Sequence, residues 1–166
     1  MAYTNLDFYK TEYWGCMIPD KEFPRFVEKA SCFLDVITFD RLADGLPENE
    51  RAKTKVQKAV CAVADKLYQL ELAERQGLSA AAGDSVSSGS GGITTGVITS
   101  RSAGSESVSY ASLSEMANGA KTWSAIYQAA GDEQATNKLL SDTAKVYLMG
   151  VKDNEETYCY MQECKG

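Results

Sequence analysis

The chain has 166 residues, with 17 basic and 23 acidic side chains, a formal net charge of −6 and no histidine. The lack of histidine excludes a Ser-His-Asp triad, a His-ligated metal site and an imidazole general base. The acidic balance argues against sequence-independent binding of nucleic acid. With 44% hydrophobic residues, the chain is long enough for one domain with a real core.

The chain begins without the basic and then apolar pattern of a secretion signal. Its longest strongly apolar run, residues 59–64, is far shorter than the roughly 20 residues that cross a bilayer. We therefore expect a soluble protein made in the cytosol, with its five cysteines reduced. Cys32 and Cys61 lie among apolar residues and are expected in the core. No metal-ligand spacing occurs, and no cofactor is expected.

Aromatic residues crowd the start of the chain, where Gly15 and Pro19 interrupt any long element. We expect an irregular arm that buries its rings in its own core or on a neighbouring subunit. Trp14, and Trp123 later in the chain, are interpreted as packing anchors. The other large apolar residues of this arm are Tyr3, Leu6, Phe8, Tyr9 and Tyr13.

A first helix is predicted over residues 20–39, with Asp20 as its N-cap and Pro24 in its first turn. Apolar residues repeat every three or four positions along it. These residues are Phe23, Phe26, Val27, Ala30, Phe33, Leu34 and Ile37.

A second helix is predicted over residues 47–76, opened by Pro47 at its first position and stopped by Gly77. Its first half carries a cluster of basic residues. This cluster is either a solvated face or a contact to an acidic neighbour or to phosphate. The basic residues are Arg51, Lys53, Lys55 and Lys58.

Residues 77–111 contain seven glycines and ten serines among 35 positions. Such a tract loses too much entropy on ordering to form a compact unit alone. Its second half favours strands, because β-branched residues precede an alternating run that places Val108 and Tyr110 on one face. We expect a mobile start followed by a β-hairpin, and an insertion of this length is usually functional.

A third helix is predicted to start at the capping box of residues 112–115 and to end at Gly131. A fourth helix is predicted from the N-cap Asp132 to Gly150. Residues 151–166 are acidic and then tyrosine-rich, and are expected to form an arm.

No constellation of residues carries an evident reaction. The chain contains no Gly-Lys pair, so it lacks a phosphate-binding loop. Two carboxylate pairs exist, one at a predicted helix start (Asp132 and Glu133) and one in the tail (Glu155 and Glu156). A helix start favours negative charge without any catalytic role. A helical body with arms and a hairpin favours an assembly subunit rather than an enzyme.

Several segments, in this order, resemble the head–tail connector (adaptor) proteins of tailed double-stranded DNA phages. The most similar is the hairpin half at residues 104–110, GSESVSY, which a helix follows. The others are YTNLDFY at 3–9, IPDKEF at 18–23, VQKAVCAVA at 56–64 and AKVYLMGV at 144–151. The tract of residues 79–90 and the tail beyond Val151 depart from the family pattern by being longer.

The resemblance implies a mainly α protein: a small bundle of about four helices with a β-hairpin insertion and extended N- and C-terminal arms. Residues 1–150 would form the connector domain, with the insertion at 77–111, and residues 151–166 the C-terminal arm. Such subunits form a ring, typically a dodecamer, below the portal protein and above a stopper or tail-completion protein. Double-stranded DNA passes through the ring without sequence-specific binding. The implied location is the head–tail junction of the virion, with no membrane and no enzymatic activity.

Two groups of residues follow as candidate contact sites. The one-sided strand pattern needs a partner surface, so we expect contacts with adjacent subunits at Ile93, Val97, Ile98, Val108 and Tyr110. The tail is the candidate for docking to the portal, through Tyr158, Tyr160 and Met161.

The acidic balance predicts a lumen in which acidic side chains let DNA slide.

Three alternatives remain open: another phage neck component, such as a stopper or tail-completion protein; a helical adaptor that binds one protein through residues 51–58; and a histidine-free enzyme that uses carboxylates.

Overall fold

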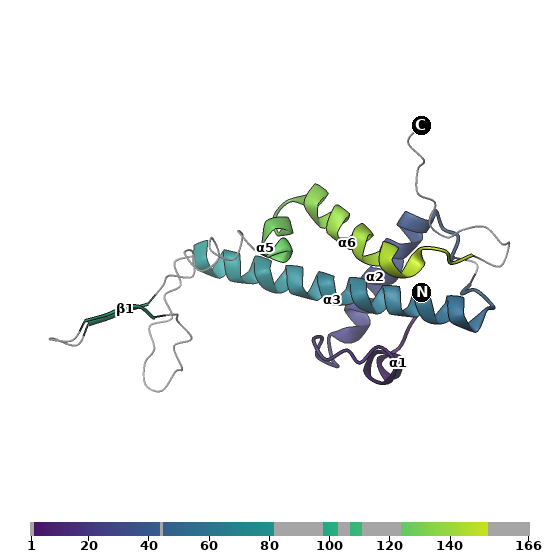
Figure 1. Cartoon of the computed structure of the whole chain (residues 1–166), viewed down its shortest axis with the longest axis horizontal. Helices are drawn as coiled ribbons and strands as arrows, with labels where there is room; N and C mark the ends of the chain where they lie inside the picture. The colour runs from purple at the N-terminus through teal and green to yellow at the C-terminus, as the bar shows by residue number, and fades with distance from the viewer. Residues whose placement is uncertain (1, 44, 82–97, 103–106, 111–123, 153–166) are drawn as a thin grey trace.

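A computed structural model describes residues 2–43, 45–81, 98–102, 107–110 and 124–152 (Figure 1). These residues are mainly helical, which confirms the predicted class. The helices are α1 (Leu6–Thr11), α2 (Phe23–Thr38), α3 (Glu50–Ala81), α5 (Ala125–Ala129) and α6 (Glu133–Leu148). Two strands are described, β1 (Ile98–Ser102) and β2 (Ser107–Tyr110).

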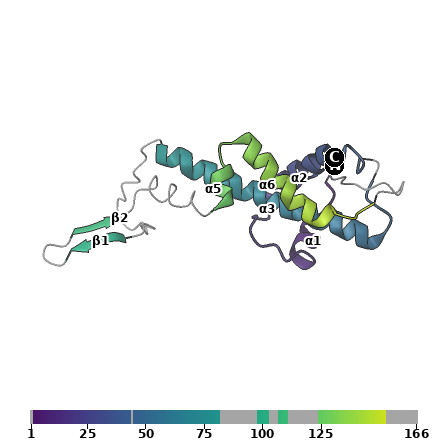
Figure 2. The same cartoon turned by 45° about the horizontal axis from the view of Figure 1, so that its top comes forward.

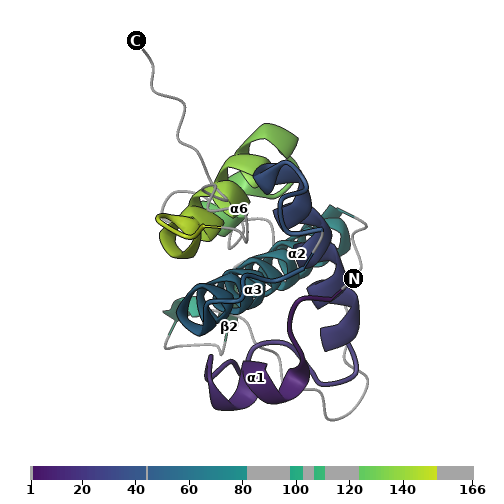
Figure 3. The same cartoon turned by 90° about the vertical axis from the view of Figure 1, so that its right-hand side faces the viewer.

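The long helix α3 lies at the centre of the helical body. Seen end-on, α1, α2 and α6 surround it (Figure 3). α3 packs mainly against α2 and α6, and α5 contacts both α3 and α6. Its buried residues form one continuous core with the neighbouring helices, and burial of this apolar surface is the main stabilising contribution. The largest fully buried side chains include Tyr9, Phe26, Leu34, Leu42, Val60 and Leu148.

The start of the chain is not the irregular arm that the sequence predicts. Asn5 caps a short helix, α1, because its Oδ1 accepts a 2.9 Å hydrogen bond from the Phe8 amide. Tyr9 is fully buried and Tyr3 is 7% exposed. The segment therefore folds back onto its own chain, and the prediction of an extended N-terminal arm is wrong.

Helix α2 begins at Phe23 rather than at Asp20. Asp20 instead forms an ion pair with Lys10 at 2.5 Å, so its carboxylate does not cap the helix. Pro24 lies in the first turn, as predicted. The helix ends at Thr38, and Phe39 follows in the left-handed conformation with φ of 55°.

Helix α3 begins later and ends later than predicted. The Asn49 side chain accepts hydrogen bonds from the amides of Arg51 and Ala52, at 3.0 and 3.2 Å, so the helix starts at Glu50. The helix continues through Gly77 to Ala81, because a glycine costs a helix only about 1 kcal/mol and need not end it. The glycine-rich insertion therefore cannot begin at residue 77.

The capping predicted for the last helix is confirmed. Asp132 accepts hydrogen bonds from the amides of Gln134 and Ala135, and α6 runs from Glu133 to Leu148. Gly131 and Gly150 flank it with φ of 85° and 75°, values that favour glycine. The predicted start of the third helix, at residues 112–115, lies outside the described residues; α5 covers only Ala125–Ala129.

Strands β1 and β2 pair antiparallel, with Ile98 opposite Tyr110 and Arg101 opposite Val108. The register shifts by one residue between Ile98 and Ser100. The pair lies beyond the C-terminal end of α3, apart from the helices (Figure 2). The turn expected at residues 103–105 lies outside the described residues.

Two further expectations about single residues are wrong. Cys61 is buried as predicted, but Cys32 is exposed, because it lies on the outer side of α2 while the neighbouring Ser31 faces the core. Trp14 is 80% exposed and therefore does not anchor the core. Among the described helices, none combines the length and the apolar character that a membrane span needs.

Candidate functional site

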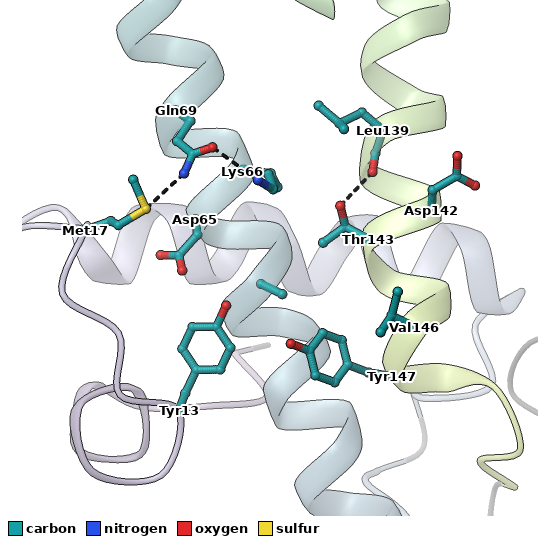
Figure 4. Close-up of a pocket in the computed structure, with 11 residues that line it drawn as sticks. Tyr13, Met17, Asp65, Lys66, Gln69, Leu139, Asp142, Thr143, Val146 and Tyr147 are labelled. Carbon is teal, nitrogen blue, oxygen red and sulfur yellow. Dashed lines mark hydrogen bonds between the residues drawn. The ribbon is translucent and has the colours of Figure 1, made fainter. Parts of the chain in front are cut away.

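A groove lies between α3 and α6, with a volume of about 560 Å³ (Figure 4). The loop that follows α1 contributes Tyr13 and Met17, which lie across α3 from the residues of α6 (Figure 4). From α3 it is lined by Ala62, Asp65, Lys66 and Gln69, and from α6 by Leu139, Asp142, Thr143, Val146 and Tyr147.

Tyr9 holds the loop against α3. Its hydroxyl donates a 2.6 Å hydrogen bond to Asp65 Oδ1. The Tyr9 hydroxyl oxygen itself accepts hydrogen bonds from the amides of Met17 and Ile18, at 3.2 and 3.3 Å. One buried hydroxyl thus fixes the helix, the carboxylate and the returning loop together.

Gly15 allows the loop to approach the Tyr9 ring. A Cβ at Gly15 would collide with ring atoms of Tyr9, so no larger residue fits without movement. The Gly15 amide also donates a 2.8 Å hydrogen bond to the Tyr9 carbonyl. The residue before it, Trp14, has φ of 59°, and this left-handed turn leaves the indole in solvent.

Asp65 is the one acidic side chain with an unusual environment at this groove. Burial raises its pKa, and hydrogen bonds from Tyr9 and Tyr13 together with the charge of Lys66 oppose that rise. Burial and the nearby Asp65 carboxylate in turn raise the pKa values of both tyrosines. Tyr13 points its hydroxyl toward Asp65 from the groove side (Figure 4).

Tyr9, Tyr13 and Asp65 hold the loop against α3 through hydrogen bonds. This arrangement is typical of a structural contact rather than of a paired general acid and general base. The second carboxylate of the groove, Asp142, forms an ion pair with Lys145 at 3.2 Å. Among the residues with described placement, no group of three or more His, Cys, Asp or Glu lies where it could hold a metal ion. The side chains that line the groove include two tyrosine rings, Tyr13 and Tyr147, and several apolar residues.

The most exposed large apolar side chains among the described residues lie at three places on the helical body. Val36 and Phe39 lie at the C-terminal end of α2, where they are 73% and 77% exposed. Val146 and Met149 lie at the C-terminal end of α6, at 75% and 61%. Trp14 forms the third place. Exposed apolar groups of this size are typical of contact surfaces.

Three of the residues proposed from the sequence as contact sites belong to described elements, and those elements do not form the groove. Ile98, Val108 and Tyr110 belong to the strand pair, where Ile98 and Tyr110 are cross-strand partners. The remaining candidates lie outside the described residues. They are Ile93, Val97, Tyr158, Tyr160 and Met161.

The sequence analysis missed Asp65 and the tyrosines that bind it. A signal was present, because Asp65 follows the apolar run 59–64 directly, and a charge at the end of such a run needs a partner. Comparison of the chain with known protein families, curated proteins and solved structures gives no match.

Proposed function

We propose that this protein is a structural subunit of a phage neck, which forms an oligomeric ring between the portal and the tail. The observation that carries the proposal is the exposure of large apolar side chains at separate places on a small helical body. A monomer with no partner would gain by burying or replacing such side chains. The segments that resemble head–tail connectors are the reason for proposing a ring below the portal rather than another kind of assembly.

The positions of the exposed side chains favour head-to-tail contacts. Val36 and Phe39 lie on α2, and α2 crosses behind α3 and α6 when the groove is viewed from the front (Figure 4). Val146 lies on the groove side. Two separate patches of different composition allow heterologous contacts, which close into a ring when the rotation between subunits permits.

The β-hairpin insertion adds a second contact in this proposal. A two-stranded hairpin is marginally stable alone and gains stability by packing on another surface. The strand pair lies apart from the helices of its own chain (Figure 1). We assign its partner surface to adjacent subunits, through Ile98, Val108 and Tyr110 together with Ile93 and Val97.

The remaining parts of the assembly follow the same proposal. The C-terminal arm, with Tyr158, Tyr160 and Met161, docks to the portal, and a stopper or tail-completion protein binds below the ring. The net charge of −6 per subunit, summed over a dodecamer, lines the lumen with acidic groups that do not retain DNA phosphates. The protein would then be found at the head–tail junction of the virion.

Co-expression with the cognate portal protein tests the proposal. Negative-stain electron microscopy should show an additional ring on the portal, and deletion of residues 93–110 should remove the ring or disorder it. Portals that carry no additional density, or normal rings from the deletion variant, would contradict the proposal. A resolved lumen lined chiefly by Lys and Arg would contradict the assignment of the acidic surface.

A helical adaptor that binds one acidic protein is the second candidate. The observation in its favour is the set of basic residues at the start of α3: Arg51, Lys55 and Lys58 form no ion pair within the described ranges. A chain that stays monomeric or dimeric at every concentration, with and without portal, would favour this candidate. A β-barrel stopper is the weaker alternative, because the described residues are mainly helical.

A further inference from the structure

A line of side chains on α3 runs from the first turn of the helix into the groove. Its members are spaced three or four residues apart and so lie on one face of the helix. They are Arg51, Lys55, Lys58, Ala62, Asp65 and Gln69.

The first part of this line is positively charged and uncompensated. Arg51, Lys55 and Lys58, here called the basic strip, form no ion pair in the part of the chain that is described. Lys53, which lies off the line, pairs with Glu50 at 3.6 Å. The groove therefore continues at one end into a strip of free cations.

The groove itself accepts uncharged, aromatic or apolar side chains. Met17 and Val146 leave apolar surface exposed at its edges, and the rings of Tyr13 and Tyr147 lie within it. Its carboxylates, Asp65 and Asp142, would repel an acidic occupant placed directly between the helices. A fitting occupant is thus acidic where it meets the basic strip and uncharged beyond it.

The C-terminal segment of this chain has that composition. Its first part carries Asp153, Glu155 and Glu156, and residues 157–162, TYCYMQ, bear no charge. The order of acidic and then aromatic residues matches the order of the basic strip and the groove.

The segment also starts at the right place. α6 ends beside the N-terminal half of α3 (Figure 1), and Val151, 1% exposed, still packs on the core. From Lys58 to Gln69 the helix rises about 17 Å, whereas eight extended residues span about 26 Å. The segment can therefore pass the basic strip and reach the groove of its own molecule.

We propose that residues 153–161 bind along the α3–α6 groove of their own chain. The acidic residues lie on the basic strip, and Tyr158, Tyr160 and Met161 occupy the groove. The contact is independent of ring formation. If the proposed function is also correct, it covers the portal-docking residues in the free subunit, and the portal must displace them.

Disulfide capture in the full-length chain tests this contact, because Cys159 lies between the two tyrosines. The background variant carries Cys16→Ser, Cys32→Ser and Cys164→Ser, which leaves Cys159 and the buried Cys61. Val146→Cys places a thiol at the groove, and Val36→Cys places one on α2 with closely matched exposure, 75% against 73%. Mild oxidation at high dilution, followed by mass spectrometry, identifies the pairs formed within one molecule.

The expected result is a bond between residues 146 and 159 within one chain, formed at least about tenfold faster than the bond between 36 and 159. Lys55→Glu with Lys58→Glu should slow capture, and Glu155→Lys with Glu156→Lys should restore it. Equal rates at the two positions would overturn the proposal, and so would capture only between two molecules. Circular dichroism of each variant confirms that the helices remain. Neither result depends on the portal, so failure here is distinct from failure of the proposed function.

Discussion

The Tyr9 hydroxyl donates a 2.6 Å hydrogen bond to Asp65 Oδ1, across 56 positions of sequence. This bond joins the first helix to the middle of the longest one. Because the same hydroxyl also accepts from the amides of Met17 and Ile18, its loss would leave several buried groups without a partner.

Tyr9→Phe should lower the free energy of unfolding by about 2 kcal/mol, because it removes one of the hydrogen bonds to the Asp65 carboxylate and leaves two amides without their acceptor, while the ring stays. Urea unfolding followed by circular dichroism measures the change. Tyr68→Phe is the matched control, since the Tyr68 ring packs edge-on against Phe26 at 5.3 Å and its hydroxyl has no hydrogen bond among the described residues. An equal effect of the two substitutions would show that the hydrogen bonds of the Tyr9 hydroxyl do not stabilise the fold.

The contribution of Asp65 to the free energy of unfolding should decrease as the pH rises. Burial raises its pKa in the folded chain above the ordinary 3.8, so the folded state holds this proton more tightly than the unfolded state. Its contribution to stability is complete below the unfolded pKa and is lost as the pH rises through the folded pKa. Asp65→Asn keeps an oxygen that accepts from Tyr9 but removes the charge.

The stability of Asp65→Asn relative to the unchanged protein should therefore increase as the pH rises above the ordinary pKa of 3.8 and through the raised pKa of the folded chain. Urea unfolding at a series of pH values measures this difference. Two curves that stay parallel across the range would contradict the assignment.

Gly15→Ala should destabilise the fold by about 1–3 kcal/mol, because the new Cβ collides with the Tyr9 ring. A double-mutant cycle separates this collision from any effect on the backbone. In a chain that already carries Tyr9→Ala, the cost of Gly15→Ala should fall below about 0.5 kcal/mol. If Gly15→Ala destabilises the Tyr9→Ala chain as much as the unchanged chain, a collision with the Tyr9 ring is not the cause of the destabilisation.

Phe39→Gly should stabilise the isolated subunit and weaken the assembly. The residue has φ of 55° and is 77% exposed, so glycine relieves about 1 kcal/mol of backbone strain and little packing is lost. If Phe39 contacts a neighbouring subunit, the variant should form fewer rings on the portal, although its thermal midpoint is higher.

Asp40→Gly is the control for that variant, because Asp40 also has a positive φ, 58°, and keeps Phe39 in place. It should leave ring formation unchanged. Loss of rings in both variants would attribute the effect to the turn rather than to the phenyl group. Normal rings in both would remove Phe39 from the contact surface.

The sequence predicts the long elements well where periodicity and capping agree. The apolar spacing of α2 and the Asp132 cap of α6 were both read correctly. The stop at Gly77 was wrong, because glycine ends a helix only when the chain turns there, and local sequence does not decide that. The predicted start at Pro47 is three residues too early, since the Asn49 side chain provides the cap and the helix begins at Glu50.

The groove could not be predicted from the pattern of single segments. It depends on Tyr9, Tyr13 and Asp65, which meet only when the first residues fold back onto α3. Aromatic crowding at residues 3–14 correctly indicated burial of Tyr3 and Tyr9, but not that Trp14 would turn outward. The indole turns outward at a residue with φ of 59°, a backbone conformation that sequence spacing does not reveal.

The continuation of α3 through Gly77 has a mechanical consequence. At 32 residues the helix is about 48 Å long, and its packing partners α2 and α6 hold it as a stiff rod. From Val63 in the core to Ala81 the helix rises about 27 Å, so a tilt of about 5° at the core moves the far tip by about 2 Å. Small adjustments among the packed helices are thus carried to the end that leads to the strand pair.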